Sequence, residues 1–155
     1  MADYHGQANG AGRRVCIVAS RFNAMVTDRL IEGAREELLR RGVADPDVDL
    51  VRVPGAWEIP LAAARAAQGS YDAILALGCV IRGETSHFEH ISRTVTDALT
   101  HIQVQSGIPV ALGILTTESL AQALARAGGE VGHIGIQAAE AALEMCDLLS
   151  RMGSP

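Results

Sequence analysis

Short apolar runs alternate along the chain with longer stretches in which apolar residues recur every three or four positions. Runs of this length are typical of buried strands, and the longer spacing is typical of amphipathic helices. The predicted strands are Val15–Ser20, Val48–Val53, Asp72–Val80 and Val110–Leu115. The predicted helices are Thr27–Gly42, Glu58–Gln68, His87–Gln105, Thr117–Ala127 and Gly135–Arg151. This order predicts a single-domain α/β three-layer sandwich of flavodoxin-like type, a four-stranded parallel sheet with helices on both faces.

Two local details of the helices follow from the spacing. Glu36 with Arg40, and Glu37 with Arg41, are spaced for i,i+4 ion pairs on one helix. Thr117 stands directly before an apolar helical face, so we expect its hydroxyl to cap that helix.

The composition fits one globular domain: of 155 residues, 48% are hydrophobic and 20% charged. The net charge of −5 argues against a nucleic-acid partner, and the apolar runs are too short for a membrane span. Cys16, Cys79 and Cys146 lie in apolar segments without the spacing of metal ligands. We therefore expect buried thiols, a cytoplasmic protein and no metal site.

Residues 1–12 are polar and rich in glycine, without the basic and apolar regions of a signal peptide. We expect a flexible N-terminal arm, and the alternative is an arm that orders against a neighbouring subunit. The folded domain then covers residues 13–155.

In open parallel sheets, ligands bind beyond the carboxyl ends of the strands. The segments that follow the predicted strands are therefore the expected site: Ser20–Asn23, Pro54–Glu58, Ile81–His87 and Thr116–Glu118. Phe22 is placed either to stack on a flat ring or to pack in the core. Gly55 lets a ligand approach the backbone, and Glu58 either accepts from ligand hydroxyls or interacts with a helix dipole.

The third segment carries the strongest chemical signal. Gly83 ends a strand, and Glu84, Thr85 and Ser86 lead into a helix, where free N–H groups and hydroxyls form an anion site. His87 follows and is suited to proton transfer near neutral pH. The alternatives are a simple helix cap and a solvent-facing histidine.

Arg126, near the end of a later predicted helix, is either a dipole partner or a phosphate clamp. Together these residues predict an α/β enzyme that performs acid–base chemistry on a phosphorylated small molecule. The sequence shows no P-loop, metal cluster or nucleophile with an orienting triad.

Five motifs give the chain a family resemblance. They are Arg21-Phe22-Asn23, Val53–Pro60 (VPGAWEIP), Leu77–Phe88 (LGCVIRGETSHF), Gly113–Ser119 (GILTTES) and the alanine-rich stretch from Ala138 to Met145. In this order, across about residues 13–150, they resemble the lumazine synthases of riboflavin biosynthesis.

The resemblance implies a reaction between two small-molecule substrates. 5-Amino-6-(D-ribitylamino)uracil condenses with 3,4-dihydroxy-2-butanone 4-phosphate to give 6,7-dimethyl-8-ribityllumazine, phosphate and water. It implies no cofactor and no metal, because the substrate amine is the nucleophile and the enzyme holds both reactants in register. It also implies homo-oligomers, namely pentamers with active sites between subunits, twelve of which often close into a 60-subunit shell.

The resemblance also implies roles for individual residues. The pyrimidine and ribityl group would be bound by Phe22, Asn23, Ala56, Trp57, Glu58, Cys79, Val80, Ile81 and Leu112. The phosphate would be bound by Gly83, Glu84, Thr85 and, from an adjacent subunit, Arg126. His87 would be the catalytic acid and base.

Two positions depart from the family pattern. Leu112 stands where relatives have an aromatic residue or Asn, and Ile134 replaces a lysine that contacts the substrate. Loss of one charged hydrogen bond weakens binding by roughly 10–100-fold, unless His133 supplies the missing cation. The alternatives to the synthase are therefore a diverged paralogue that binds a flavin or lumazine with little turnover, and a structural shell protein.

Overall fold

The computed structural model describes residues 1–154, and its four strands form one parallel sheet in the order β2-β1-β3-β4. The strands are β1 (Val15–Ser20), β2 (Val48–Val53), β3 (Ala73–Ile81) and β4 (Val110–Thr117). The helices are α1 (Ala24–Arg40), α2 (Ile59–Ala66), α3 (His87–Ser106), α4 (Leu120–Ala125) and α5 (Ile134–Met152), with short 3-10 helices η1 (Asp45–Asp47) and η2 (Ala56–Glu58). The predicted α/β sandwich is therefore confirmed.

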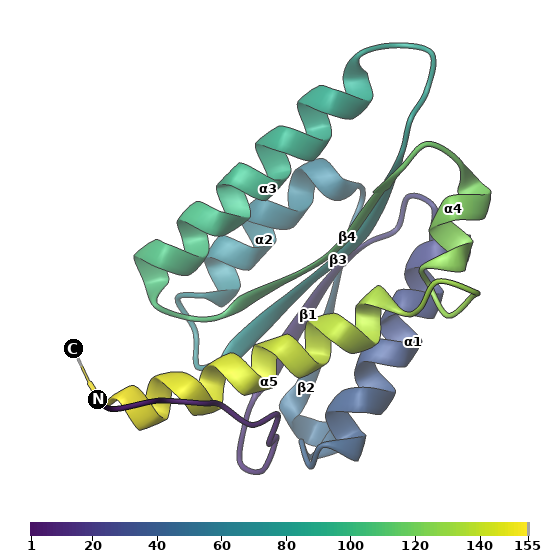
Figure 1. Cartoon of the computed structure of the whole chain (residues 1–155). Helices are drawn as coiled ribbons and strands as arrows, with labels where there is room; N and C mark the ends of the chain where they lie inside the picture. Colours follow the sequence, from purple (N-terminus) through teal and green to yellow (C-terminus); the bar gives the residue numbers. More distant parts are fainter. Residues whose placement is uncertain (155) are drawn as a thin grey trace.

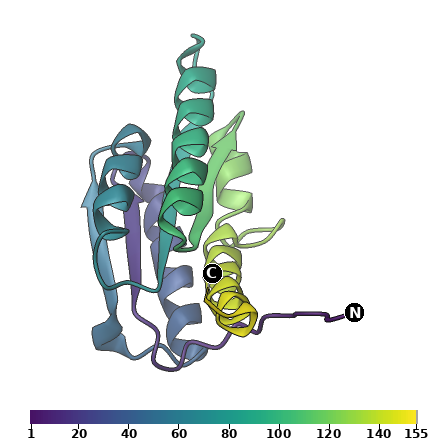
Figure 2. The same ribbon diagram turned by 90° about the vertical axis from the view of Figure 1, so that its left-hand side faces the viewer.

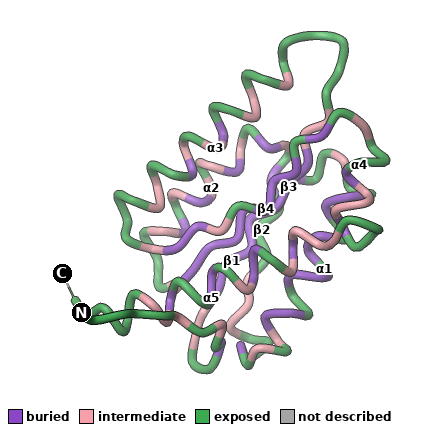
Figure 3. Tube along the Cα trace, in the orientation of Figure 1, coloured by how far each residue is buried: buried purple, intermediate pink, exposed green. Residues whose placement is uncertain are grey.

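The helices cover the sheet in two layers. Helices α1 and α5 lie on one face and α2 and α3 on the other (Figures 1 and 2). Each layer has its own apolar cluster against the strands. Helix α3 is exposed along most of its length, with Val95 and Leu99 as its buried residues (Figure 3). Within residues 1–154, no helix combines the length and apolar character needed to cross a membrane.

Helices α3 and α5 match the predicted bounds to within one residue, and the other three helices begin at a different residue for a local reason. Helix α1 begins at Ala24, because Asn23 adopts a left-handed conformation (φ 62°) that turns the chain directly out of β1. Helix α2 begins after η2, with a proline in its first turn. The prediction that Thr117 caps α4 is wrong: Thr117 still pairs with β3, and Ser119 Oγ accepts from the backbone N–H of Gln122 (3.2 Å).

A buried carboxylate joins the two helices on one face of the sheet. Glu37 is 7% exposed and accepts from both Arg40 (2.8 Å) and Arg41 (2.7 Å), so Arg40 pairs with Glu37 and not with the predicted Glu36. Arg41 also contacts Glu140 of α5 (3.0 Å). Hydrogen bonds from the two guanidinium groups lower the pKa of Glu37 to about 2.

The N-terminal arm runs alongside α5 (Figure 1). The backbone N–H of Gln7 donates to Asp147 (2.8 Å), and that of Gly10 donates to the carbonyl of Arg41 (2.9 Å). A Cβ at Gly6 would lie 2.2 Å from the Glu144 carbonyl, so the arm meets α5 at a point that only glycine fits. Its flexibility, and any contact with a neighbouring subunit, stay predictions.

We expect Glu37→Gln to lower the free energy of unfolding by roughly 1–2 kcal/mol at neutral pH, because charge-assisted hydrogen bonds are lost. The pKa of Glu37 falls from its ordinary 4.5 to about 2 on folding. Its contribution is therefore complete above pH 4.5 and disappears as the pH falls through 2. Urea unfolding of both proteins across this pH range measures the effect. A difference in the free energy of unfolding between wild type and variant that stays constant with pH would contradict the lowered pKa of Glu37.

Candidate active site

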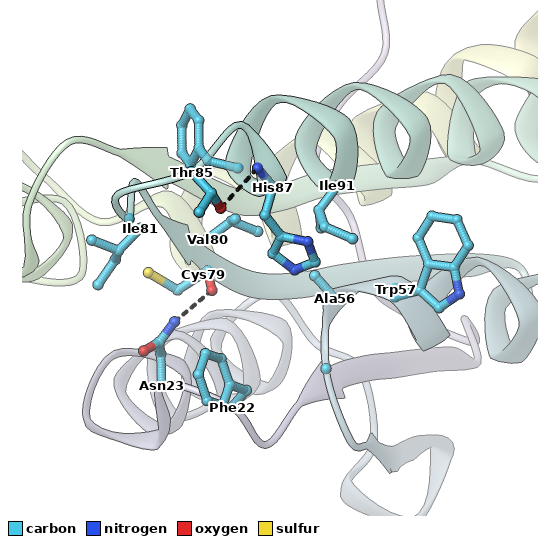
Figure 4. Close-up of a pocket in the computed structure, with 13 residues that line it drawn as sticks. Phe22, Asn23, Ala56, Trp57, Cys79, Val80, Ile81, Thr85, His87 and Ile91 are labelled. Atoms are coloured by element: carbon cyan, nitrogen blue, oxygen red, sulfur yellow. Dashed lines mark hydrogen bonds between the residues drawn. The ribbon is translucent and has the colours of Figure 1, made fainter.

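A pocket of about 260 Å³ opens at the carboxyl ends of β1, β2 and β3 (Figure 4). Strands β1 and β3 are neighbours from which the chain crosses in opposite directions, so the pocket lies at the topological switch point. Most of the predicted site residues line it: Phe22, Asn23, Ala56, Trp57, Cys79, Val80, Ile81, Gly83, Thr85 and His87. Gly55, Phe88 and Ile91 complete the wall.

The turn from β1 into α1 presents an aromatic ring to the pocket. The backbone N–H groups of Arg21 and Phe22 donate to the chain at the end of β2 (2.8 and 3.1 Å), which fixes the turn. Asn23 donates its side-chain amide to the carbonyl of Cys79 (2.8 Å) and so ties this turn to β3. The Phe22 side chain is 72% exposed at the rim, which excludes the alternative of a core phenylalanine.

The segment after β2 supplies a small residue and a second exposed aromatic. Ala56 is buried, and the Trp57 side chain is 57% exposed (Figure 4). The carboxylate of Glu58 accepts from the backbone N–H of Gly55 (2.9 Å) and does not line the pocket. Glu58 therefore stabilises its own turn through this backbone hydrogen bond.

The end of β3 forms the back of the pocket. Cys79 is buried, and burial raises the pKa of its thiol to about 11. The thiol is therefore neutral at physiological pH and a poor nucleophile. Val80 and Ile81 are half-buried and add apolar surface beside it.

The loop between β3 and α3 faces solvent. Gly83 to His87 are all exposed, and a Cβ at Gly83 would meet open space. The Thr85 hydroxyl accepts a long hydrogen bond from the backbone N–H of His87 (3.4 Å). Figure 4 shows the His87 imidazole projecting from the first turn of α3 toward Ala56, on the same pocket as the two exposed aromatics.

Four predicted site residues lie outside this pocket: Glu58, Glu84, Leu112 and Arg126. Leu112 lies on the edge strand β4, on the same sheet face as Val110 and Ile114, and is 50% exposed. Glu84 is exposed in the loop.

Arg126 lines a second cavity, of about 190 Å³, with Leu115, Val131, Gly132, His133, Ile134 and Gln137. Ile134 packs against the apolar cluster beneath α5. His133 caps α5 by accepting the N–H of Ile136 at Nδ1 (3.3 Å), and its ring lies against Gly33. The structure therefore gives His133 a helix-capping role.

Comparison with known proteins assigns the chain to a family. The sequence profile of 6,7-dimethyl-8-ribityllumazine synthase matches residues 12–150. The synthase of Xanthomonas campestris pv. campestris (strain B100) is 48% identical over 150 residues, 96% of this chain and 97% of the relative. The synthase of Xylella fastidiosa (strain M12) is 48% identical over 153 residues, which are 98% of this chain and 99% of the relative.

The chain belongs to the 6,7-dimethyl-8-ribityllumazine synthase family. The resemblance seen in the motifs is therefore confirmed. Of the residues to which the resemblance gives a role, those at the ends of β1, β2 and β3 or in the segments that follow meet in one pocket, apart from Glu58 and Glu84. Leu112 on β4 and Arg126 after α4 do not line it.

Sequence reasoning missed two lining residues, Phe88 and Ile91. Ile91 lies one helical turn after His87, so the 3.6-residue period of α3 places both side chains on the same face of the helix and could have predicted its position. Phe88 follows His87 directly, and its side chain lies under the guanidinium of Arg82 (4.6 Å to the ring centre). No spacing rule predicts that contact.

We expect Asn23→Ala to destabilise the fold by roughly 1–2 kcal/mol, because the hydrogen bond to Cys79 is lost and alanine disfavours a positive φ. Asn23→Gly should recover only the stability lost through the positive φ, because glycine adopts this backbone conformation freely. Denaturant unfolding of the three proteins separates the two contributions. An alanine variant as stable as the wild type would show that the side chain does not fix the turn.

Proposed function

We propose that this protein condenses 5-amino-6-(D-ribitylamino)uracil with 3,4-dihydroxy-2-butanone 4-phosphate to give 6,7-dimethyl-8-ribityllumazine, phosphate and water. The observation that carries the proposal is one pocket lined by an exposed aromatic ring, the loop before α3 and an imidazole. Family membership supports the same reaction.

The pyrimidine occupies the apolar part of the pocket. Phe22 stacks on its face, and the chain at Cys79–Ile81 lines its edge. The ribityl chain lies along Asn23 and Ala56–Glu58, where Glu58 turns from Gly55 to the ligand hydroxyls on binding. Leu112 contributes apolar surface from a neighbouring subunit, because it lies outside the pocket of its own chain.

The phosphate binds at the N-terminus of α3. We place the phosphate at the N–H groups of Gly83, Glu84 and Thr85 and at the Thr85 hydroxyl, because the helix dipole favours an anion there. Glu84 acts through its backbone, since its carboxylate would repel a phosphate. Gly83 leaves the approach open, because no atom lies within 4 Å of its Cβ position.

Catalysis then depends on positioning. Holding two reactants at the correct distance lowers a barrier by about 7–11 kcal/mol, so an enzyme nucleophile is unnecessary. The substrate amine attacks the ketone, and His87 transfers protons as the imine forms and phosphate leaves. The neutral Cys79 thiol takes no part.

The complete site requires a second subunit. Arg126 lies in a different cavity from His87 within one chain, and it is the permanent cation among the residues that line that cavity. We place Arg126 of one subunit at the phosphate bound by its neighbour, in a pentamer. Exposed apolar side chains on the α2–α3 side, Trp57, Leu61 and Val104, supply surface for the contact. The buried free thiols Cys16, Cys79 and Cys146 suit a cytoplasmic location.

The direct test mixes the purified protein with both substrates and follows product fluorescence. We expect rapid formation of product by the wild type. We expect His87→Ala to lower kcat about 100-fold, the low end of what general acid–base catalysis contributes, because positioning supplies the rest. Product formation by His87→Ala at the wild-type rate would remove the histidine from the mechanism, and no product from the wild type would reject the function.

A second experiment tests the shared site. His87→Ala and Arg126→Ala subunits, each poorly active alone, are mixed in equal amounts, dissociated and reassembled. About a quarter of the interfaces then join an intact His87 to an intact Arg126, so about 25% of wild-type activity should return. If both residues serve the same subunit's site, mixing restores nothing beyond the average of the two variants.

A further inference from the structure

Arg82 stands immediately before the phosphate-binding loop but does not line the pocket. We propose that Arg82 is a positioning residue, which holds the Gly83–Thr85 loop and His87 in the geometry that the reaction needs. This inference rests on the proposed function, because it assigns a role within the same site.

The loop itself has little support. Within residues 1–154, the hydrogen bonds of residues 83–86 join them to the first turn of α3 and to nothing else. These residues are exposed. The position of the loop is therefore set by its two ends, and Arg82 is one of them.

Arg82 connects the start of α3 to the end of β4. Its Nε contacts Glu118 (2.7 Å), and its Nη1 pairs with Glu89 in the first turn of α3. Its guanidinium lies over the ring of Phe88, 4.6 Å from the centre. Its backbone N–H donates to the carbonyl of Thr117 (2.9 Å). Phe88 and Glu89 directly follow His87, so these contacts fix the helix turn that carries the imidazole.

The charges around Arg82 argue against a direct role in binding phosphate. One guanidinium faces two carboxylates, Glu89 and Glu118, which leaves the cluster with a net negative charge. The hydrogen bond from Arg82 also lowers the pKa of Glu89, so this carboxylate is ionised at neutral pH. Such a cluster repels an incoming phosphate. Arg82 therefore influences phosphate binding only through the position of the loop.

The same cluster is attached to α4. The backbone N–H of Glu118 donates to Gln122 Oε1 (2.9 Å), and Arg126 donates to the carbonyl of Gln122 (3.0 Å). Both segments that are proposed to bind phosphate, the loop and the end of α4 that is followed by Arg126, are therefore attached to the contacts of Arg82.

The test compares Arg82→Gln with wild type in the full-length assembled protein. We expect kcat/KM for the butanone phosphate to fall by about 10–100-fold, because a displacement of about 1 Å has effects of this size. KM for the pyrimidine should change by less than about twofold, because Phe22 and Trp57 are attached elsewhere. A variant that merely loses folded protein would lower kcat and leave both KM values unchanged, and that result would overturn the proposal.

Arg35→Gln is the matched control. Arg35 is an exposed arginine paired with Asp45, at the opposite end of the sheet from the pocket. The Arg35→Gln substitution removes one surface ion pair without touching the loop, so the kinetic constants of this variant should match those of the wild type. An equal loss of kcat/KM in both variants would show that removing any surface ion pair has this effect, and that Arg82 has no special role.

Calorimetric titration with inorganic phosphate distinguishes positioning from direct binding. If Arg82 positions the loop, Glu89→Gln/Glu118→Gln weakens phosphate binding as Arg82→Gln does. If Arg82 binds phosphate itself, removal of the two carboxylates tightens binding, and the proposal fails. The titration needs no turnover, so it still tests Arg82 if the wild type makes no product. Absence of phosphate binding by the wild type would also overturn it.

Discussion

The site depends on the point at which β1 and β3 separate. The two strands pair in register as far as Ala19 and Leu77, and then β1 turns away into α1 while β3 continues beside β4. This leaves the carbonyl of Cys79 without a strand partner on the β1 side, and the Asn23 amide donates to it (2.8 Å). An unpaired buried carbonyl costs about 1–3 kcal/mol, so this contact both satisfies the end of β3 and ties to it the turn that presents Phe22.

The pocket draws its groups from several elements. Two exposed aromatic rings come from the chain after β1 and β2, and the loop after β3 leads into the helix turn that carries His87. The turn that carries Phe22 is held by hydrogen bonds to the ends of β2 and β3, whereas the exposed loop relies, in our proposal, on the contacts of Arg82 at its start. Such a division suits a reaction of two substrates, because each is held by a different part of one fold.

The sequence predicted where the site lies better than what each side chain does. The strand ends were predictable, because apolar runs and the alternation of elements place Phe22, Ala56 and His87 at one edge of a parallel sheet. The roles of Glu58 and Thr117 were not, because several nearby backbone groups can accept or donate equally well and only the folded chain selects one. Glu58 turns to Gly55, and Ser119 takes the capping role expected of Thr117.

Arg126 and Leu112 show a different limit. Neither residue belongs to the five motifs that match the family, and one chain does not bring them to His87, because each lies outside the pocket that the chain forms alone. A pattern in a single sequence does not state which subunit completes a site. Ile134, which stands where the resemblance implies a lysine, shows the same limit. Its side chain packs on the apolar cluster beneath α5, and Arg126 carries the positive charge in the cavity that both residues line. In the proposed mechanism, phosphate recognition across the subunit interface depends on Arg126, which donates to the carbonyl of Gln122 at the end of α4.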